Sequence, residues 1–224
     1  MAAYVHLVRH AEVANPEGVV YGSLPGFGLS ERGVEQARRV ARYLGPRPVV
    51  AIWSSPLERA LRTAEEIAAR SGAPVHVDFA LTEMGLADRW AGHRWDTLGS
   101  DFPGELESYL SDPMDLSFTP EPLDDVADRV CTVVRRLEES HPHGDVVVVS
   151  HQDPIQAARL RLTGRRLISF HDDKPAPAGV ITLRPGAAWT EETSWAPDES
   201  PRGDGSQLRL ITVDKRDDEP PDTA

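Results

Sequence analysis

Residues 4–15 read YVHLVRHAEVAN, a mostly apolar run that ends in an arginine and a histidine. A short run of this kind with β-branched members is typical of a strand buried in a sheet. In an open parallel sheet, ligands bind in the crevice beyond the carboxyl ends of the strands. Arg9 and His10 occupy such an end. This stretch therefore predicts both a buried strand and a binding site beside it.

Strands and helices alternate along the chain from this stretch onward. Predicted strands cover residues 4–8, 49–53, 75–77, 145–150 and 179–183, and helical spacing of apolar residues covers 31–44, 56–70, 126–137 and 154–162. This alternation is typical of parallel strands joined by crossover helices. It predicts an α/β protein, a three-layer α/β/α sandwich with a mainly parallel central sheet. Residues 81–125 are rich in Gly, Pro, Asp and Trp and predict a partly helical excursion at the sheet edge.

The helix after the second predicted strand has the clearest start signal. Ser55 stands at the position of an N-cap, Pro56 falls in the first turn, and Glu58 follows the cap by three residues. Together they match a capping box. The sequence therefore predicts that the Ser55 hydroxyl caps this helix.

Composition limits the classes of partner. The 224 residues carry 24 Lys and Arg against 36 Asp and Glu, a net charge of −12, which disfavours nucleic acid and anionic membranes as partners. No apolar run approaches the ~20 residues of a membrane-spanning helix. The single cysteine, Cys131, cannot form an internal disulfide, and the N-terminus lacks the features of a secretion signal. These features predict a cytoplasmic protein.

One domain is expected over residues 1–185, because the composition shifts to Pro, Gly, Ser and acidic residues after Pro185. Residues 186–224 are expected to form a C-terminal extension with a possible edge strand at 207–213 and a disordered acidic tail. No set of Cys, His and Asp residues has the spacing of metal ligands, so the sequence predicts no metal site.

Three predicted strand ends would meet in one crevice. They bring Arg9 with His10, Arg59 in the first turn of the capped helix, and His151 before another helix. Two guanidinium groups, two imidazoles and the free amides of a helix N-terminus suit a phosphoryl group. A neutral histidine nitrogen can also attack phosphorus. The set therefore predicts a phosphoryl-transfer site.

Five segments resemble the successive motifs of the histidine phosphatase superfamily, which is also called phosphoglycerate mutase-like. They are LVRHAEVAN (7–15), GLSERGVEQA (28–37), SSPLERALRTAEEIA (54–68), LTEMGLADRWAG (81–92) and VVVVSHQDPI (146–155). The first, third and last together form a specific signal. The resemblance implies that His10 is the nucleophile and becomes phosphorylated. It also implies that Arg9, Arg59 and His151 bind the phosphoryl oxygens.

Further roles follow from the same resemblance. Glu83 matches the position that protonates the leaving alkoxide and then serves as base for water. Asn15 matches an asparagine that contacts the phosphate or the edge of the substrate. A separate branch takes its acid from an aspartate directly after the second histidine; Gln152 stands there in this chain, so Asp153 is only an alternative to Glu83. Tyr21, Trp90, His93 and Trp95 are candidates for the substrate entrance or for packing of the loop.

The resemblance thus implies a metal-independent phosphomonoester hydrolase that acts through phosphohistidine on a small phosphorylated metabolite, without a cofactor. A phosphoglycerate mutase is the first alternative. It would need a second basic cluster, for which Arg89 and Arg94 are the only candidates between residues 81 and 125. A non-catalytic module that binds phosphorylated ligands is the second. The sequence indicates no particular oligomeric state.

Overall fold

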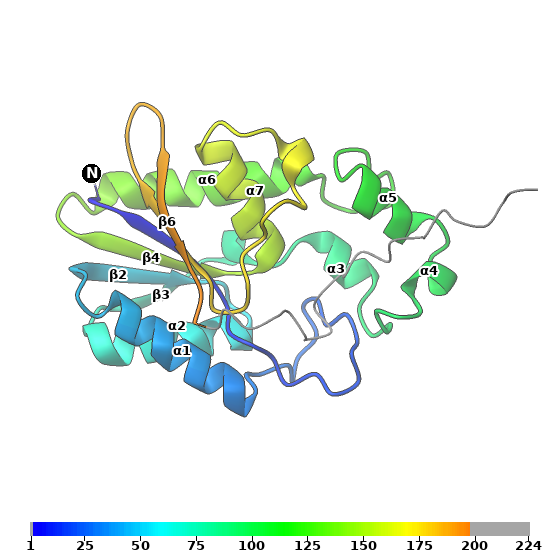
Figure 1. Cartoon of the computed structure of the whole chain (residues 1–224), viewed down its shortest axis with the longest axis horizontal. Helices are drawn as coiled ribbons and strands as arrows, with labels where there is room; N and C mark the ends of the chain where they lie inside the picture. The colour runs from blue at the N-terminus through cyan, green and yellow to red at the C-terminus, as the bar shows by residue number, and fades with distance from the viewer. Residues whose placement is uncertain (1, 198–224) are drawn as a thin grey trace, which may run out of the picture.

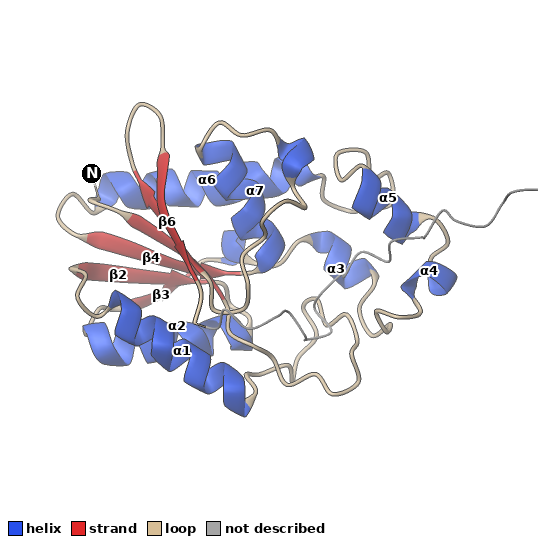
Figure 2. Cartoon of the chain, in the orientation of Figure 1, coloured by secondary structure: helices blue, strands red, loops and turns tan. Residues whose placement is uncertain are grey.

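The computed structural model describes residues 2–197, which form a six-stranded sheet with helices on both faces (Figure 1, Figure 2). The strands lie in the order β3-β2-β4-β1-β5-β6. Neighbours among β1 to β4 pair in parallel. β5 pairs antiparallel with β1, and β6 pairs antiparallel with β5. The strands are β1 (Val5–Arg9), β2 (Val49–Ser54), β3 (Val75–Val77), β4 (Asp145–Ser150), β5 (Val180–Arg184) and β6 (Thr190–Trp195). The predicted three-layer fold with a mainly parallel sheet is confirmed.

Two pairs of helices cover the sheet. On one face lie α1 (Glu31–Leu44) and α2 (Glu58–Ser71), and on the other lie α6 (Leu123–Ser140) and α7 (Gln152–Leu162) (Figure 1). Apolar residues of β1, β2 and β4 pack against each pair, so the sheet is buried on both sides. This is why β4 is apolar along most of its length, without a polar face.

The chain between β3 and α6 leaves the sheet, as predicted, and forms short helices beyond the carboxyl ends of the parallel strands (Figure 1). A third apolar cluster, separate from the two at the sheet, ties this excursion to α6 and α7. None of the helices in residues 2–197 is both long enough and apolar enough to cross a membrane. The short elements are η1 (Phe79–Leu81), α3 (Gly85–Arg89), α4 (Leu98–Asp101), α5 (Glu105–Ser111) and η2 (Leu167–Ser169).

A buried polar group links three strands away from the site. His6 on β1 bonds through Nδ1 to Thr182 Oγ1 on β5 and through Nε2 to Asp145 Oδ2 on β4, at 3.0 Å each. All three side chains are almost fully buried. His6 is therefore a packed polar residue of the sheet. Cys131 is buried on α6 as a free thiol.

Two features differ from the sequence prediction. The helix α2 begins at Glu58 with Leu57 at the N-cap and has no side-chain capping bond, so the prediction that Ser55 caps it is wrong. The Ser55 hydroxyl instead bonds to a histidine, as described below. In addition, β6 pairs with β5 within the segment expected to be the extension. The predicted domain boundary at residue 185 stays a prediction, and the predicted strand at 207–213 lies outside the described residues.

Candidate active site

The two central parallel strands bring His10 and His151 together. The register of β1 and β4 pairs Arg9 with Ser150, so each histidine directly follows a paired residue. The backbone N–H of His10 continues the ladder and donates to the carbonyl of Ser150 at 2.9 Å. The ring centroids lie 5.2 Å apart at an angle of 60°. Both rings are buried, which fixes them at one end of the sheet.

The orientation of His10 sets its proton. Its Nδ1 lies 2.8 Å from the carbonyl oxygen of Ala11, and because a carbonyl only accepts, Nδ1 must carry the hydrogen. Burial lowers the pKa of His10 well below its usual value, and the charges of Arg59 and Arg9 lower it further. The ring is therefore neutral near pH 7, and Nε2 carries the lone pair. This is the form that a nucleophile needs.

Arg59 and Arg9 supply the positive charge. Arg59 lies in the first turn of α2, is 1% exposed, donates to the carbonyl of Gly22 at 2.8 Å, and lies 4.7 Å from the centre of the Tyr21 ring. Arg9 ends β1, is also buried, and donates to the carbonyl of Pro175 at 3.0 Å. Burial lowers the pKa of Arg59, but a guanidinium still stays charged. The two forks therefore form a fixed positive environment for an anion.

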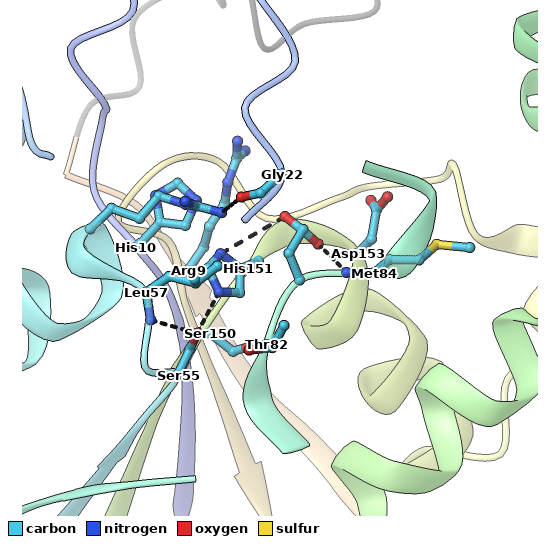
Figure 3. Close-up of polar contacts among 12 residues, drawn as sticks. Arg9, His10, Gly22, Ser55, Leu57, Thr82, Met84, Ser150, His151 and Asp153 are labelled. Atoms are coloured by element: carbon cyan, nitrogen blue, oxygen red, sulfur yellow. Dashed lines mark hydrogen bonds and ion pairs between the residues drawn. The ribbon is translucent and has the colours of Figure 1, made fainter. Parts of the chain in front are cut away.

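His151 is hydrogen-bonded through one ring nitrogen and faces Glu83 with the other (Figure 3). Its Nε2 lies 2.8 Å from the Ser55 hydroxyl, and its Nδ1 lies 3.8 Å from Oε2 of Glu83. The Ser55 hydroxyl also accepts from the backbone N–H of Leu57 at 3.3 Å. Burial lowers the pKa of His151 well below its usual value, and Arg59 and His10 add to the effect. Ser55 therefore orients His151.

Glu83 lies between η1 and α3, opposite the histidines. Its Oε1 accepts from the backbone N–H of Met84 at 2.9 Å. Burial raises the pKa of Glu83 to about 7, and the negative charge of Asp153 adds to the rise, whereas Arg59 opposes it. A carboxyl group with this pKa can donate and accept a proton near neutral pH.

A polar cluster behind Glu83 was not predicted from the sequence. The Tyr109 hydroxyl donates to Asp153 Oδ2 at 2.9 Å, and Lys174 Nζ donates to Asp153 Oδ1 and to the Tyr109 oxygen at 2.8 Å each. Burial alone would raise the pKa of Asp153, but Lys174 and Tyr109 outweigh it and lower the pKa. Asp153 therefore stays ionised. No local pattern joins residues 109, 153 and 174, because they come from three distant segments.

One pocket is lined by Arg9, His10 and Glu83 among these groups, whereas Arg59 and His151 do not belong to its lining. Tyr21 and Trp95 line this pocket, and their role at the substrate entrance stays a prediction. Trp90 is buried and donates to Glu105, and His93 contacts Asp101. The pocket is lined by Arg9, His10, Val20, Tyr21, Gly22, Glu83, Ala87, Trp95, Tyr109, Gln152 and Asp153.

Asn15 is placed differently. Its amide donates from Nδ2 to the carbonyl of Val19 at 2.8 Å and accepts at Oδ1 from the Val19 N–H at 3.2 Å. Both ends of the amide thus close the loop that leads to Val20, which lines the pocket. Contact of Asn15 with substrate stays a prediction. Within residues 2–197, no group of three or more His, Cys, Asp or Glu residues is arranged to hold a metal ion.

Comparison with known proteins shows the family to which the chain belongs. A family model of the histidine phosphatase superfamily (branch 1) matches residues 5–196. The chain belongs to this superfamily. The matched region includes β6, so the similarity to other histidine phosphatases extends through the whole sheet.

Relatives of this histidine phosphatase include named phosphatases and an uncharacterised protein. Phosphoserine phosphatase 1 of Hydrogenobacter thermophilus is 34% identical over 166 residues, which cover 73% of this chain and 78% of that protein. An uncharacterised protein of Mycobacterium tuberculosis is 42% identical over 187 residues, covering 80% and 87%. The solved structure of a mycobacterial glucosyl-3-phosphoglycerate phosphatase matches with a TM-score of 0.76 at 27% identity, covering 88% of this chain and 100% of that chain. The resemblance seen in the sequence and the assignment to an enzyme family are confirmed.

Proposed function

We propose that this histidine phosphatase is a phosphomonoester hydrolase that acts through a phosphohistidine on His10, without a metal ion. The observation that carries the proposal is the neutral His10 beside two buried arginines, with the protonatable Glu83 lining the same pocket. These parts match the needs of the reaction: a nucleophile, positive charge for the phosphoryl oxygens, and an acid for the leaving group.

In the first step, Nε2 of His10 attacks phosphorus, and the bond from phosphorus to the ester oxygen breaks. The guanidinium groups of Arg9 and Arg59 stabilise the negative charge on the phosphoryl oxygens. The carboxyl group of Glu83 donates its proton to the departing alkoxide, which leaves as an alcohol. His151, held by Ser55, donates a hydrogen bond to the phosphoryl group from the ring nitrogen that carries its proton.

In the second step, water attacks the phosphorus of the phosphohistidine. The carboxylate of Glu83 accepts a proton from that water, and the bond from phosphorus to Nε2 breaks. Inorganic phosphate leaves, and His10 returns to its neutral form with Glu83 protonated. The pKa of about 7 suits this double use, because both forms of Glu83 are populated near neutrality.

We propose a small phosphorylated metabolite as the substrate. Similar proteins include a phosphoserine phosphatase and a glucosyl-3-phosphoglycerate phosphatase, which act on small phosphate esters. In this chain the pocket beyond the phosphoryl site has the aromatic walls Tyr21 and Trp95. Such walls suit the organic part of a small ester.

The mutase alternative needs a second anion site, and its two candidates are engaged elsewhere. Arg89 forms two bonds to Glu105, and Arg94 forms two bonds to Asp96 and one to the carbonyl of Glu17. This favours hydrolysis over return of the phosphoryl group to a second hydroxyl.

Trapping of the intermediate tests the proposal. The protein would be incubated with a ³²P-labelled phosphomonoester and quenched, and acid-labile, base-stable label on the protein would be measured. We expect label on the wild type and none on His10→Ala, together with a loss of at least ~10³ in turnover. Full activity of His10→Ala would overturn the proposal. Binding of phosphate without turnover between pH 5 and 8 would favour the non-catalytic module.

A second measurement separates hydrolase from mutase. ³¹P NMR would follow 3-phosphoglycerate with and without 2,3-bisphosphoglycerate. We expect free phosphate to appear faster than the 2-phospho isomer. The reverse order would decide for the mutase.

A further inference from the structure

The segment that carries Glu83 has an unusual set of hydrogen bonds. The carbonyls of Ala80, Leu81, Thr82 and Glu83 are four consecutive acceptors, and each accepts from a side chain of another element. These residues follow one another from the end of η1 to the start of α3, where the backbone is not helical throughout. Partly buried carbonyls of such a segment need donors from elsewhere. The identity of those donors therefore decides where Glu83 lies.

Arg129 of α6 supplies three of the four bonds. Its Nη1 donates to the carbonyls of Ala80 at 2.7 Å and Thr82 at 2.9 Å, and its Nη2 donates to the carbonyl of Glu83 at 3.2 Å. The remaining two N–H groups bind Glu121, from Nε at 2.5 Å and from Nη2 at 3.1 Å. All five donors of the guanidinium are thus used.

Glu121 extends this contact past the acid. Its Oε2 also accepts from the backbone N–H of Gly85 at 3.3 Å. A Cβ at Gly85 would lie 2.9 Å from Cγ of Pro120, so the backbone there packs closely against the segment that carries Glu121. The ion pair of Arg129 and Glu121 therefore holds the chain on both sides of Glu83.

Ser150 supplies the fourth bond and links residues 80–83, here called the acid segment, to the histidines. Its hydroxyl donates to the carbonyl of Leu81 at 2.7 Å, and it directly precedes His151 on the chain. The same residue accepts at its carbonyl from the backbone N–H of His10. Figure 3 shows Ser150 between the histidines and Thr82 of the acid segment. Ser150 of β4 thus bonds to the segment that carries Glu83 and to the backbone of His10, and it directly precedes His151.

We propose that Arg129, with Glu121 and Ser150, positions the carboxyl group of Glu83 for proton transfer to the leaving alcohol. This inference rests on the proposed function, in which Glu83 is the acid. Arg129 does not line the pocket and acts through the backbone, so it is a positioning residue. Misplacement of an acid by ~1 Å can cost ~10²-fold in rate. The effect must therefore appear in the step that needs the proton.

The dependence on the leaving group separates positioning from a general structural role. A nitrophenolate leaves without a proton, whereas an alkoxide must be protonated as the bond breaks. The ratio kcat/KM reports the first phosphoryl transfer and not the later attack of water. A defect in the acid therefore lowers kcat/KM for an alkyl phosphate and leaves that for an aryl phosphate nearly unchanged. A general loss of folded enzyme lowers both equally.

The test compares kcat/KM for glycerol phosphate and nitrophenyl phosphate in Arg129→Lys. An ammonium has three donors and can replace at most three of the five bonds. We expect a loss of at least ~10-fold for the alkyl ester and less than ~3-fold for the aryl ester. Arg161→Gln is the matched control. Arg161 lies on α7 and pairs with Asp124 and Asp128 of α6, the helix that carries Arg129, and it does not touch the acid segment. It should change neither value.

The outcomes separate this inference from the proposed function. Glu83→Gln should lower kcat/KM for the alkyl ester more than Arg129→Lys does, and should again leave kcat/KM for the aryl ester nearly unchanged. If Glu83→Gln is selective and Arg129→Lys lowers both esters equally or neither, the positioning role alone is wrong. If Glu83→Gln shows no selectivity, the acid role fails and the positioning role fails with it. Should Arg129→Lys not fold, Ser150→Ala carries the same test, since it removes only the bond to Leu81.

Discussion

Nδ1 of His151 lies 3.8 Å from Oε2 of Glu83, too far for a hydrogen bond and close enough for both groups to reach one phosphoryl ester. His151 comes from the end of β4, and Glu83 from the excursion beyond the sheet. Their approach puts an acid with a pKa of about 7 beside two neutral imidazoles and two arginines. The predictions below follow from this arrangement.

The raised pKa of Glu83 has a cost in stability. The folded pKa of about 7 exceeds the usual 4.5, so between these pH values the folded state binds more protons than the unfolded state. The free energy of unfolding therefore falls as pH rises through that window. Glu83→Gln removes this loss. From pH 5 to pH 8, we expect the free energy of unfolding of the wild type, measured in urea, to fall by roughly 2 kcal/mol more than that of the variant. The assignment would be contradicted if the difference in unfolding free energy between variant and wild type were the same at pH 5 and at pH 8.

Asp153 should set the pH at which activity declines. Its negative charge raises the pKa of Glu83, so Asp153→Asn lowers that pKa and leaves Lys174 without its partner charge, which acts in the same direction. The acid must be protonated in the first step. The alkaline limb of kcat/KM on an alkyl phosphate should therefore move to lower pH. Asp128→Asn, an exposed change on α6, is the control and should leave the limb in place. A limb that does not move in Asp153→Asn would refute this role.

The bond from Ser55 to His151 should matter for phosphoryl binding. Ser55→Ala leaves Nε2 of this buried ring without its partner at 2.8 Å. Without this bond the ring of His151 is no longer held in place, and misplacement of a group in the site by ~1 Å can cost ~10²-fold in rate, so we expect kcat/KM to fall by about 10-fold or more. Ser54→Ala is the matched control, because the Ser54 hydroxyl donates to the Ser55 carbonyl and contacts neither histidine. Equal effects of the two variants would argue against a specific role for Ser55.

His6 should support the fold and not the chemistry. In His6→Leu, the buried Asp145 carboxyl group loses its bond to the imidazole. Removal of one partner from a buried pair of this kind costs about 3–5 kcal/mol. We expect a loss of roughly 3 kcal/mol in chemical unfolding, with kcat unchanged at temperatures where the variant is folded. The double change His6→Leu with Asp145→Leu should recover much of the loss. A stable single variant would show that the pair contributes little.

The sequence by itself determined the local elements and the positions that carry chemistry. Short continuous apolar runs predicted the strands from β1 to β5, because a strand buried on both faces of a sheet is apolar on both sides. Helical spacing of apolar residues predicted the helices α1, α2, α6 and α7. The strand ends at Arg9, His10 and His151 were predicted for the same reason. The edge strand β6, exposed along much of its length, has no such pattern and was missed.

Only the tertiary structure decided how the site is held. Ser55 has the pattern of a helix cap, yet in the fold its hydroxyl bonds to a histidine 96 positions away. Arg129 binds carbonyls more than 45 positions away, and Asp153 meets Tyr109 and Lys174 from three separate segments. Local spacing cannot encode such contacts. They arise when side chains from distant segments are buried together and must find partners. For the same reason the pKa of Glu83 is a property of the folded chain: burial and a distant carboxylate raise it.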